Sequence, residues 1–153
     1  MRKLGWLLDY RKFRIYLKEK YGVTRAYVFI GFLASNHGLY ERLREAGFII
    51  IFKPITRDTE GMIKGNVDGD LILNAMIEYE HYEKAVIVSG DGDFYSLAAH
   101  LRQKEKLEVV VSPNRKYCSR LLRQAAGGKI HFLDDMRHAL AYQMKKHHPG
   151  TEP

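Results

Sequence analysis

Short apolar runs alternate along this chain with segments in which apolar residues recur every three to four positions. The runs predict buried β-strands, and the helical spacing predicts amphipathic α-helices. The predicted strands cover residues 25–32, 48–53, 84–89, 107–112 and 129–133. The predicted helices cover residues 10–21, 36–46, 67–80, 94–101, 114–126 and 135–145. This alternation is typical of an α/β fold, in which helices cover both faces of a mainly parallel sheet.

Local signals set the limits of the first helix and mark one unusual connection. Asp9 is a residue type that caps helix N-termini, and Gly22 is the type that most often follows the last turn. Between them, Phe13 and Leu17 share one apolar face. Residues 54–65 form the only long polar connection in the sequence, and loops of that length are more often functional than idle.

Length and composition predict one globular domain. The 153 residues, 46% of them hydrophobic, fit a single domain at residues 1–145, followed by a disordered basic tail at residues 146–153. No apolar run approaches the roughly 20 residues that span a bilayer, and the apolar stretch after Met1 is too short for a signal peptide. Because Cys118 is the only cysteine, it can form no internal disulfide. We therefore expect a cytoplasmic protein without a membrane partner.

The charge balance favours an anionic partner. The formal net charge is +7, and a surplus of that size is typical of proteins that bind nucleic acid. Four basic residues that the spacing places on one helix are candidates for contact with an RNA backbone: Arg115, Lys116, Arg120 and Arg123. A solvated basic surface explains the same charges, and composition leaves both interpretations open.

Two carboxylates stand directly after the apolar strand of residues 84–89. Asp91 and Asp93 are separated by one glycine and preceded by another, so the backbone can turn sharply there. Clustered carboxylates repel one another unless a hard cation neutralises them. The turn therefore predicts a metal site at the carboxyl end of a strand, where α/β sheets bind ligands. The simpler alternative is a helix cap at Asp93 with a spare turn aspartate at 91.

A second acidic pair begins the helix of residues 67–80. Residues two apart on a helix point about 200° apart, so Asp68 and Asp70 are not expected to reach one ion together. Asp68 shares the face of Leu71 and is predicted to tip towards the sheet, whereas Asp70 is predicted to point into solvent. The pattern imitates the start of an EF-hand loop, but Leu71 occupies the position that requires glycine.

Other chemistries lack their motifs. The sequence contains neither a dinucleotide-binding glycine motif nor a Walker A sequence, and Ser89 stands in no nucleophile elbow. Its histidines are scattered without ligand spacing. TOPRIM and HAD-like phosphoryl-transfer enzymes also place aspartates after a strand, but the early glutamate of the first and the N-terminal Asp-x-Asp of the second are not visible.

Five segments share their order and spacing with a known family. They are residues 64–68, 86–94, 112–114, 119–125 and 133–135. The arrangement resembles the NYN domain, the LabA-like branch of the PIN-like nucleases, over nearly the whole chain. The resemblance implies a PIN-like, Rossmann-like three-layer sandwich with a mainly parallel sheet, and a ribonuclease that depends on Mg²⁺ or Mn²⁺.

The resemblance also assigns roles to residues. Asp68, Asp91 and Asp93 match the acidic positions that hold the metal and carry catalysis, and Ser89 and Asn114 match the polar positions beside them. We expect Lys64 to contact a phosphate of the substrate from the rim of the site. Single-stranded RNA is the expected partner, and the sequence leaves homo-oligomerisation open.

One departure from the family bears on activity. Family members open with a hydrophobic strand that ends in an aspartate, ahead of the helix that begins here after Asp9. We expect that strand to be missing between the strands of residues 25–32 and 84–89, which leaves their edges unpaired, and we favour a shortened N-terminus as the reason. The alternative function is a catalytically impaired NYN-like module that binds RNA or a protein.

Overall fold

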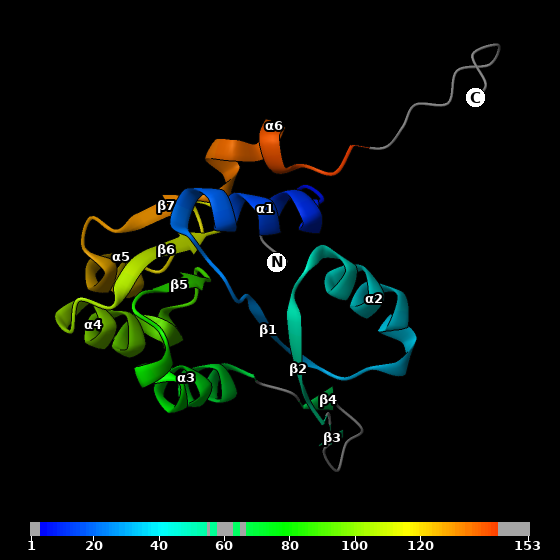
Figure 1. Cartoon of the computed structure of the whole chain (residues 1–153), viewed down its shortest axis with the longest axis horizontal. Coiled ribbons are helices and arrows are strands. Elements are labelled where there is room, and N and C mark those ends of the chain that lie inside the picture. The colour runs from blue at the N-terminus through cyan, green and yellow to red at the C-terminus, as the bar shows by residue number, and fades with distance from the viewer. Residues whose placement is uncertain (1–3, 55, 58–62, 65–66, 144–153) are drawn as a thin grey trace.

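The computed structural model describes residues 4–54, 56–57, 63–64 and 67–143, and its helices and strands alternate as the sequence predicts (Figure 1). The α-helices are α1 (Tyr10–Tyr21), α2 (His37–Ala46), α3 (Asp68–Ile77), α4 (Tyr95–Gln103), α5 (Arg120–Ala126) and α6 (Arg137–Leu140). The strands are β1 (Tyr27–Gly31), β2 (Ile49–Lys53), β3 (Thr56–Arg57), β4 (Ile63–Lys64), β5 (Ala85–Val88), β6 (Leu107–Ser112) and β7 (Ile130–Phe132). Short 3₁₀ helices are η1 (Ala34–Asn36), η2 (Tyr79–His81), η3 (Gly92–Phe94) and η4 (Leu133–Met136).

The main strands form two parallel sheets. One sheet pairs β1 with β2, and the other has the order β5-β6-β7. The predicted α/β class with mainly parallel strands is therefore confirmed. The polar connection after β2 is not a plain loop, because β3 and β4 pair there as an antiparallel ladder. The side chains of residues 55–66, including that of Lys64, lie outside the described residues.

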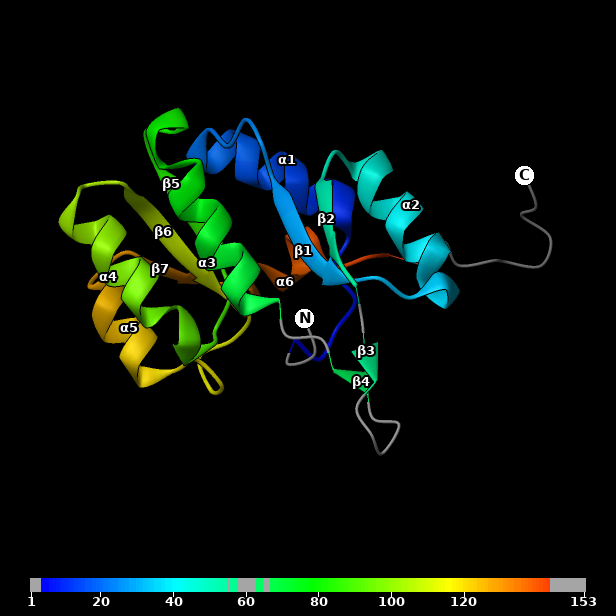
Figure 2. The ribbon, with the colours of Figure 1, turned by 90° about the horizontal axis from the view of Figure 1, so that it is seen from below.

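Helices cover the strands in layers. Phe13 and Leu17 of α1 pack in one apolar cluster with Val28 of β1 and Val111 of β6, so α1 lies across both sheets. On the opposite face of the β5-β6-β7 sheet, α4 and α5 enclose a second cluster. Leu71 and other residues of α3 pack against this second cluster, while α3 also lies against β1 (Figure 2). The result is the sandwich that the sequence predicts.

The two sheets have free edges that face away from their partner strands. Ser89 donates its backbone N–H to Val111 O, so strand alternation directs the N–H of Val88 to the edge of β5 away from β6. Likewise, Phe32 donates to Lys53 O, which directs the N–H of Phe29 away from β2. Within the described residues, no strand pairs with either free edge. The expected unpaired edges of β1 and β5 are therefore present among the described strands, whereas the missing strand itself stays a prediction.

The first helix has the limits that its sequence predicts. The Asp9 carboxylate accepts a hydrogen bond from the backbone N–H of Lys12 at 3.1 Å. At the other end, Gly22 has φ of 69°, and its N–H donates to Lys18 O. Asp9 therefore caps the N-terminus of α1, and Gly22 ends the helix, as their residue types predict.

The predicted basic helix of residues 114–126 is shorter than expected. The Asn114 side chain accepts a hydrogen bond from Tyr117 N at 2.8 Å, and the Ser119 hydroxyl caps α5 by accepting one from Leu122 N. These two caps hold residues 115–118 in a turn. The prediction that Arg115 and Lys116 share a helix with Arg120 and Arg123 was therefore wrong.

The predicted last helix is also shorter, because the backbone becomes extended at Ala141. That residue forms an antiparallel bridge with Leu8, and Tyr142 N donates to Leu7 O. The pairing ends α6 at Leu140 instead of near residue 145. The predicted tail at residues 146–153 lies outside the described residues. In the part of the chain that the structure describes, no helix has the length and apolarity to cross a membrane.

Candidate metal centre

Three carboxylates converge beyond the carboxyl end of β5. Asp68 is the first residue of α3, Asp91 is the N-cap of η3 just after β5, and Asp93 lies within η3. One carboxylate oxygen from each residue can be chosen so that all three lie within 4.8 Å of one another. The sequence predicts this convergence, and the structure confirms it.

Hydrogen bonds within the turn fix the directions of its carboxylates. The Ser89 hydroxyl accepts from Asp91 N at 3.0 Å, and the Asp91 carboxylate accepts from Asp93 N at 2.9 Å. Asp91 is therefore the helix cap, a role that the simpler interpretation gave to Asp93. Because the cap uses one oxygen of Asp91, the second oxygen of that carboxylate can still serve as a ligand.

The two glycines of the turn allow a close approach to neighbouring elements. A Cβ added at Gly90 would lie 2.8 Å from the Ser112 hydroxyl oxygen, and one at Gly92 would lie 2.6 Å from that of Ser119. Ser112 ends β6, and Ser119 caps α5. The acidic turn is thus packed directly against the next strand and helix, which explains why both positions are glycine.

The acidic cluster is electrostatically unfavourable by itself. The pKa of Asp68 is raised above its ordinary value, first by partial burial, then by the negative charges of Asp91 and Asp93 and by a hydrogen bond with Asp93. Three carboxylates that offer only oxygen ligands match the preference of a hard divalent cation, which would relieve this repulsion. The residues present therefore fit such an ion.

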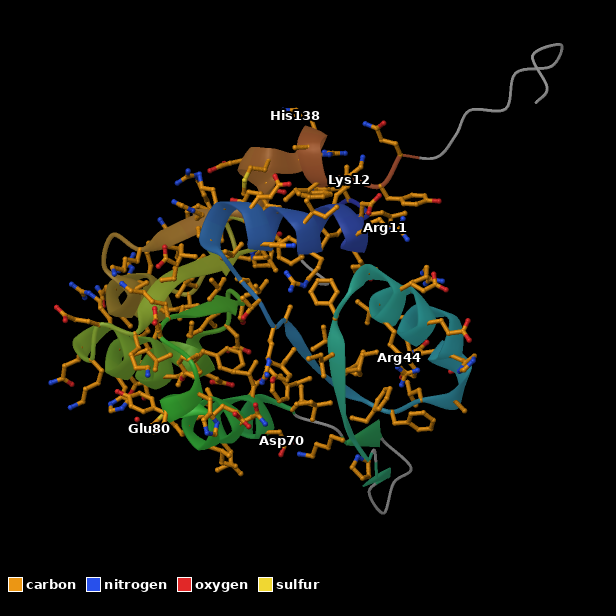
Figure 3. All side chains as sticks on the ribbon, viewed as in Figure 1. Arg11, Lys12, Arg44, Asp70, Glu80 and His138 are labelled. Carbon is orange, nitrogen blue, oxygen red and sulfur yellow. The ribbon has the colours of Figure 1, made fainter. Side chains whose placement is uncertain are left out.

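Asp70 stands apart from this cluster, as its helical position predicts. Its carboxylate lies 3.7 Å from the Lys53 ammonium nitrogen, and both side chains are partly exposed. Figure 3 shows Asp70 on α3 near the end of β2. It therefore pairs across to the β1-β2 sheet instead of standing alone in solvent.

The predicted polar neighbours line a pocket beside Asp91. Ser89 and Asn114 both border this space, whose volume is about 430 Å³. Asn114 is 8% exposed, and its side chain holds the turn through Tyr117 N. Ser112, Tyr117 and Ser119 also line the pocket. We assigned no role to these three residues from the sequence. Their positions between a predicted strand and a predicted helix could have indicated that they lie near the carboxyl end of the sheet.

Two of the four predicted basic residues are engaged within the protein. The Arg115 guanidinium lies 2.8 Å from the Asp135 carboxylate and 4.4 Å from the centre of the Phe132 ring. Arg123 donates to Arg115 O at 3.1 Å and also lies over Phe132. Arg120 is exposed on α5, and the Lys116 nitrogen lies 5.3 Å from the centre of the Tyr117 ring.

The fold and this cluster together define an α/β protein with an acidic centre at the carboxyl ends of its parallel strands. The sequence model of the NYN domain matches residues 2–134, and the chain belongs to the NYN domain family. NYN domains are PIN-like nucleases that typically use a divalent metal.

Individual relatives agree with this assignment. The chain is 27% identical over 145 residues to the low amplitude and bright protein LabA of Synechococcus elongatus. This match covers 88% of this chain and 77% of that protein. The crystal structure of a protein of unknown function from Vibrio parahaemolyticus has a TM-score of 0.75 at 22% identity. That match covers 92% of this chain and 86% of the other and shows the same fold.

Proposed function

We propose that this chain is a metal-dependent ribonuclease that hydrolyses phosphodiester bonds of single-stranded RNA in the cytoplasm. The observation that carries the proposal is the convergence of the three carboxylates within 4.8 Å, in a chain of a nuclease family. Such a cluster, held at the carboxyl end of a strand, is suited to a hard cation. Mg²⁺ and Mn²⁺ are the ions that the family resemblance implies.

Each polar residue has a defined part in this proposal. Asp68 and Asp91 bind the ion directly, and Asp93 binds it directly or through water. A bound ion supplies Lewis acidity, which polarises the phosphate and lowers the pKa of an attacking water. Ser89 orients Asp91 through its hydrogen bond to the turn, and Asn114 holds the adjoining pocket wall.

Basic residues near the site attract the RNA backbone. Lys64 contacts a phosphate at the rim. Lys116 and Arg120 are exposed on the turn and on the helix that follow the pocket. Arg123 contributes positive charge from its position over Phe132, whereas the charge of Arg115 is offset by its ion pair with Asp135.

A second candidate function is an impaired module that binds RNA or a protein without efficient cutting. The free edges of β1 and β5 favour it, because a strand between them would add both pairing and a further carboxylate. With the three carboxylates found among the described residues, an ion is held less rigidly than with four, and a displacement of about 1 Å can lower a rate on the order of 10²-fold. We therefore expect the 153-residue chain to bind Mn²⁺ weakly and to cut RNA poorly.

Cleavage of a labelled single-stranded RNA tests both candidates. The proteins to compare are the chain itself, the chain extended upstream by a hydrophobic strand that ends in aspartate, and the extended chain with Asp91→Asn. Asparagine can still accept the hydrogen bond from Asp93 N, so this variant is a matched control for the loss of charge. The extension is expected to raise Mn²⁺-dependent cleavage and stability, and Asp91→Asn is expected to abolish cleavage.

Two other outcomes discriminate between the candidates. Robust cutting by the unextended chain means that a fourth carboxylate is dispensable, and the impaired module is then rejected. Equal activity of the extended chain with and without Asp91→Asn means that the acidic cluster is not catalytic, and the nuclease is rejected.

A further inference from the structure

The pocket beside the metal centre has the size of a small-molecule site. Its volume of about 430 Å³ lies within the usual range for ligand pockets. It opens where β5 and β6 end, between the acidic turn and the turn that precedes α5. Asp91 is part of its lining, so a molecule in the pocket lies directly beside the carboxylate cluster.

The pocket walls present hydroxyl donors. The Ser89 oxygen accepts from Asp91 N, and the Ser119 oxygen accepts from Leu122 N at 3.4 Å. Because a hydroxyl that accepts one hydrogen bond keeps its own proton, both serines can still donate. A ligand in the pocket is therefore expected to carry oxygen or nitrogen acceptors, as nucleobases and phosphates do.

An aromatic residue is among those that line the pocket. Tyr117 lines the pocket and is 50% exposed, while its backbone is held by the buried Asn114 side chain. The Lys116 ammonium lies 5.3 Å from the centre of this ring and brings a positive charge next to it. An exposed aromatic ring next to a cation is a combination that proteins use to stack a base and hold its phosphate.

We propose that this pocket is a base-binding subsite, in which the nucleotide next to the cleaved phosphate stacks its base on Tyr117. The inference rests on the proposed ribonuclease function and adds a specificity-determining residue to it. Stacking requires an unpaired base, which limits the substrate to single-stranded RNA or loops. The serine hydroxyls offer few contacts that distinguish one base from another, so the subsite is expected to tolerate several bases.

RNA affinity measured without cleavage tests the subsite. The full chain with Asp91→Asn, which prevents cutting, is titrated against a fluorescein-labelled RNA of six nucleotides at low salt, by anisotropy. Tyr117→Ala is expected to weaken binding about 5- to 150-fold, the usual effect of one lost base stack. Tyr117→Phe keeps the ring and is expected to bind within about twofold of the parent. Tyr142→Ala removes a ring of similar exposure (56%) away from the pocket and is expected to change nothing.

Abasic nucleotides then locate the stacked base. Each of the six positions is made abasic in turn, and each RNA is titrated with the parent and with Tyr117→Ala. At one position the abasic change should weaken the parent but not Tyr117→Ala, because the two changes remove the same contact.

The contrary outcomes separate this proposal from the function on which it rests. If Tyr117→Ala and Tyr142→Ala bind RNA as the parent does, the subsite is wrong, and the nuclease proposal is untouched. If Tyr117→Phe weakens binding as much as Tyr117→Ala, the hydroxyl is responsible, and stacking is rejected. If the chain without any substitution binds no single-stranded RNA, both proposals fail.

Discussion

The two parallel sheets differ sharply in how well they are buried. In the β5-β6-β7 sheet, Leu107, Val110 and Val111 of the central strand are all 0% exposed. In the β1-β2 sheet, by contrast, Tyr27 is 37% exposed and Ile49 is 45% exposed. Both sheets consist of apolar strands of similar sequence, so the difference comes from what covers them.

Helices pack closely on both faces of β6, whereas one face of β1 is less completely covered. The β5-β6-β7 sheet lies between α1 on one side and α4 and α5 on the other. In the β1-β2 sheet, Val28 and Ile50 face the core. Because side chains alternate along a strand, the neighbours of these residues point to the opposite face. On that face, among the described residues, α3 borders an apolar groove of about 400 Å³.

This difference in burial indicates which carboxylates of the candidate site are carried by well-packed elements. Asp91 and Asp93 follow a strand of the well-packed sheet, and the glycines beside them lie close to Ser112 and Ser119. Asp68 comes from α3, which bridges the two sheets. The alignment of the three carboxylates therefore depends on how the well-buried β5-β6-β7 sheet packs against the less buried β1-β2 sheet.

Hydrogen exchange should show the largest contrast between the two sheets. Val110 N donates to Lys129 O inside the central strand, whereas the amides of Val88 and Phe29 point to free edges. Core amides exchange only on global unfolding, and edge amides exchange through local opening. We expect Val110 to exchange at least about 10³-fold more slowly than Val88 or Phe29 in NMR-detected exchange. Comparable protection of all three would mean that the edges are paired in solution.

The same substitution should have different effects in the two halves. Gly90→Ala places a methyl group 2.8 Å from the buried Ser112 oxygen and is expected to lower the free energy of unfolding by about 1–3 kcal/mol. Gly38→Ala on α2 meets only Arg42 at 3.5 Å. It should leave stability unchanged or raise it by up to about 0.5–1 kcal/mol. Urea unfolding measures both.

A double variant tests the cause of the first effect. Ser112→Ala removes the oxygen that the new methyl group meets, and the next contact of that methyl group is at 3.5 Å. Gly90→Ala combined with Ser112→Ala should therefore recover most of the lost stability. A double variant as unstable as the sum of the two single variants would show that the backbone, and not this contact, requires glycine.

The sequence predicted the features that local chemistry decides. The limits of α1 follow from Asp9 and Gly22, and the convergence of the carboxylates follows from strand ends and helix spacing. These signals lie within a few residues of the structure that they specify. The same is true of Asp70, whose place outside the cluster follows from the 100° per residue of a helix.

The features that sequence reasoning missed depend on contacts between distant segments. The turn at residues 115–118 is held by Asn114 and Ser119, so helical spacing alone placed Arg115 on a helix. Arg115 instead pairs with Asp135, twenty residues away. Similarly, α6 ends early because Ala141 pairs with Leu8 at the other end of the chain. Neither contact leaves a local pattern.

The smallest expected effect concerns the charge of Asp68 on α3, the helix that packs against both sheets. Asp68→Asn replaces a carboxylate whose pKa is raised by burial and by its two acidic neighbours, so the metal-free chain should become more stable. We expect its melting temperature at neutral pH to rise by about 1–3 °C, the scale of a mild surface substitution in a domain of this size. Mn²⁺ should stabilise the parent by binding the folded state alone. It should stabilise Asp68→Asn less, because a ligand is lost.

Asp70→Asn is the matched control, because it removes one carboxylate from the same helix two residues away. Asp70 pairs with Lys53 and lies outside the cluster, so this variant should gain no stability and should keep the full Mn²⁺ effect. Thermal melts of the three proteins with and without Mn²⁺ make the comparison. If Asp68→Asn lowers the metal-free melting temperature, the cluster is not under repulsion. If both variants respond to Mn²⁺ as the parent does, the ion binds elsewhere, and α3 does not carry a ligand.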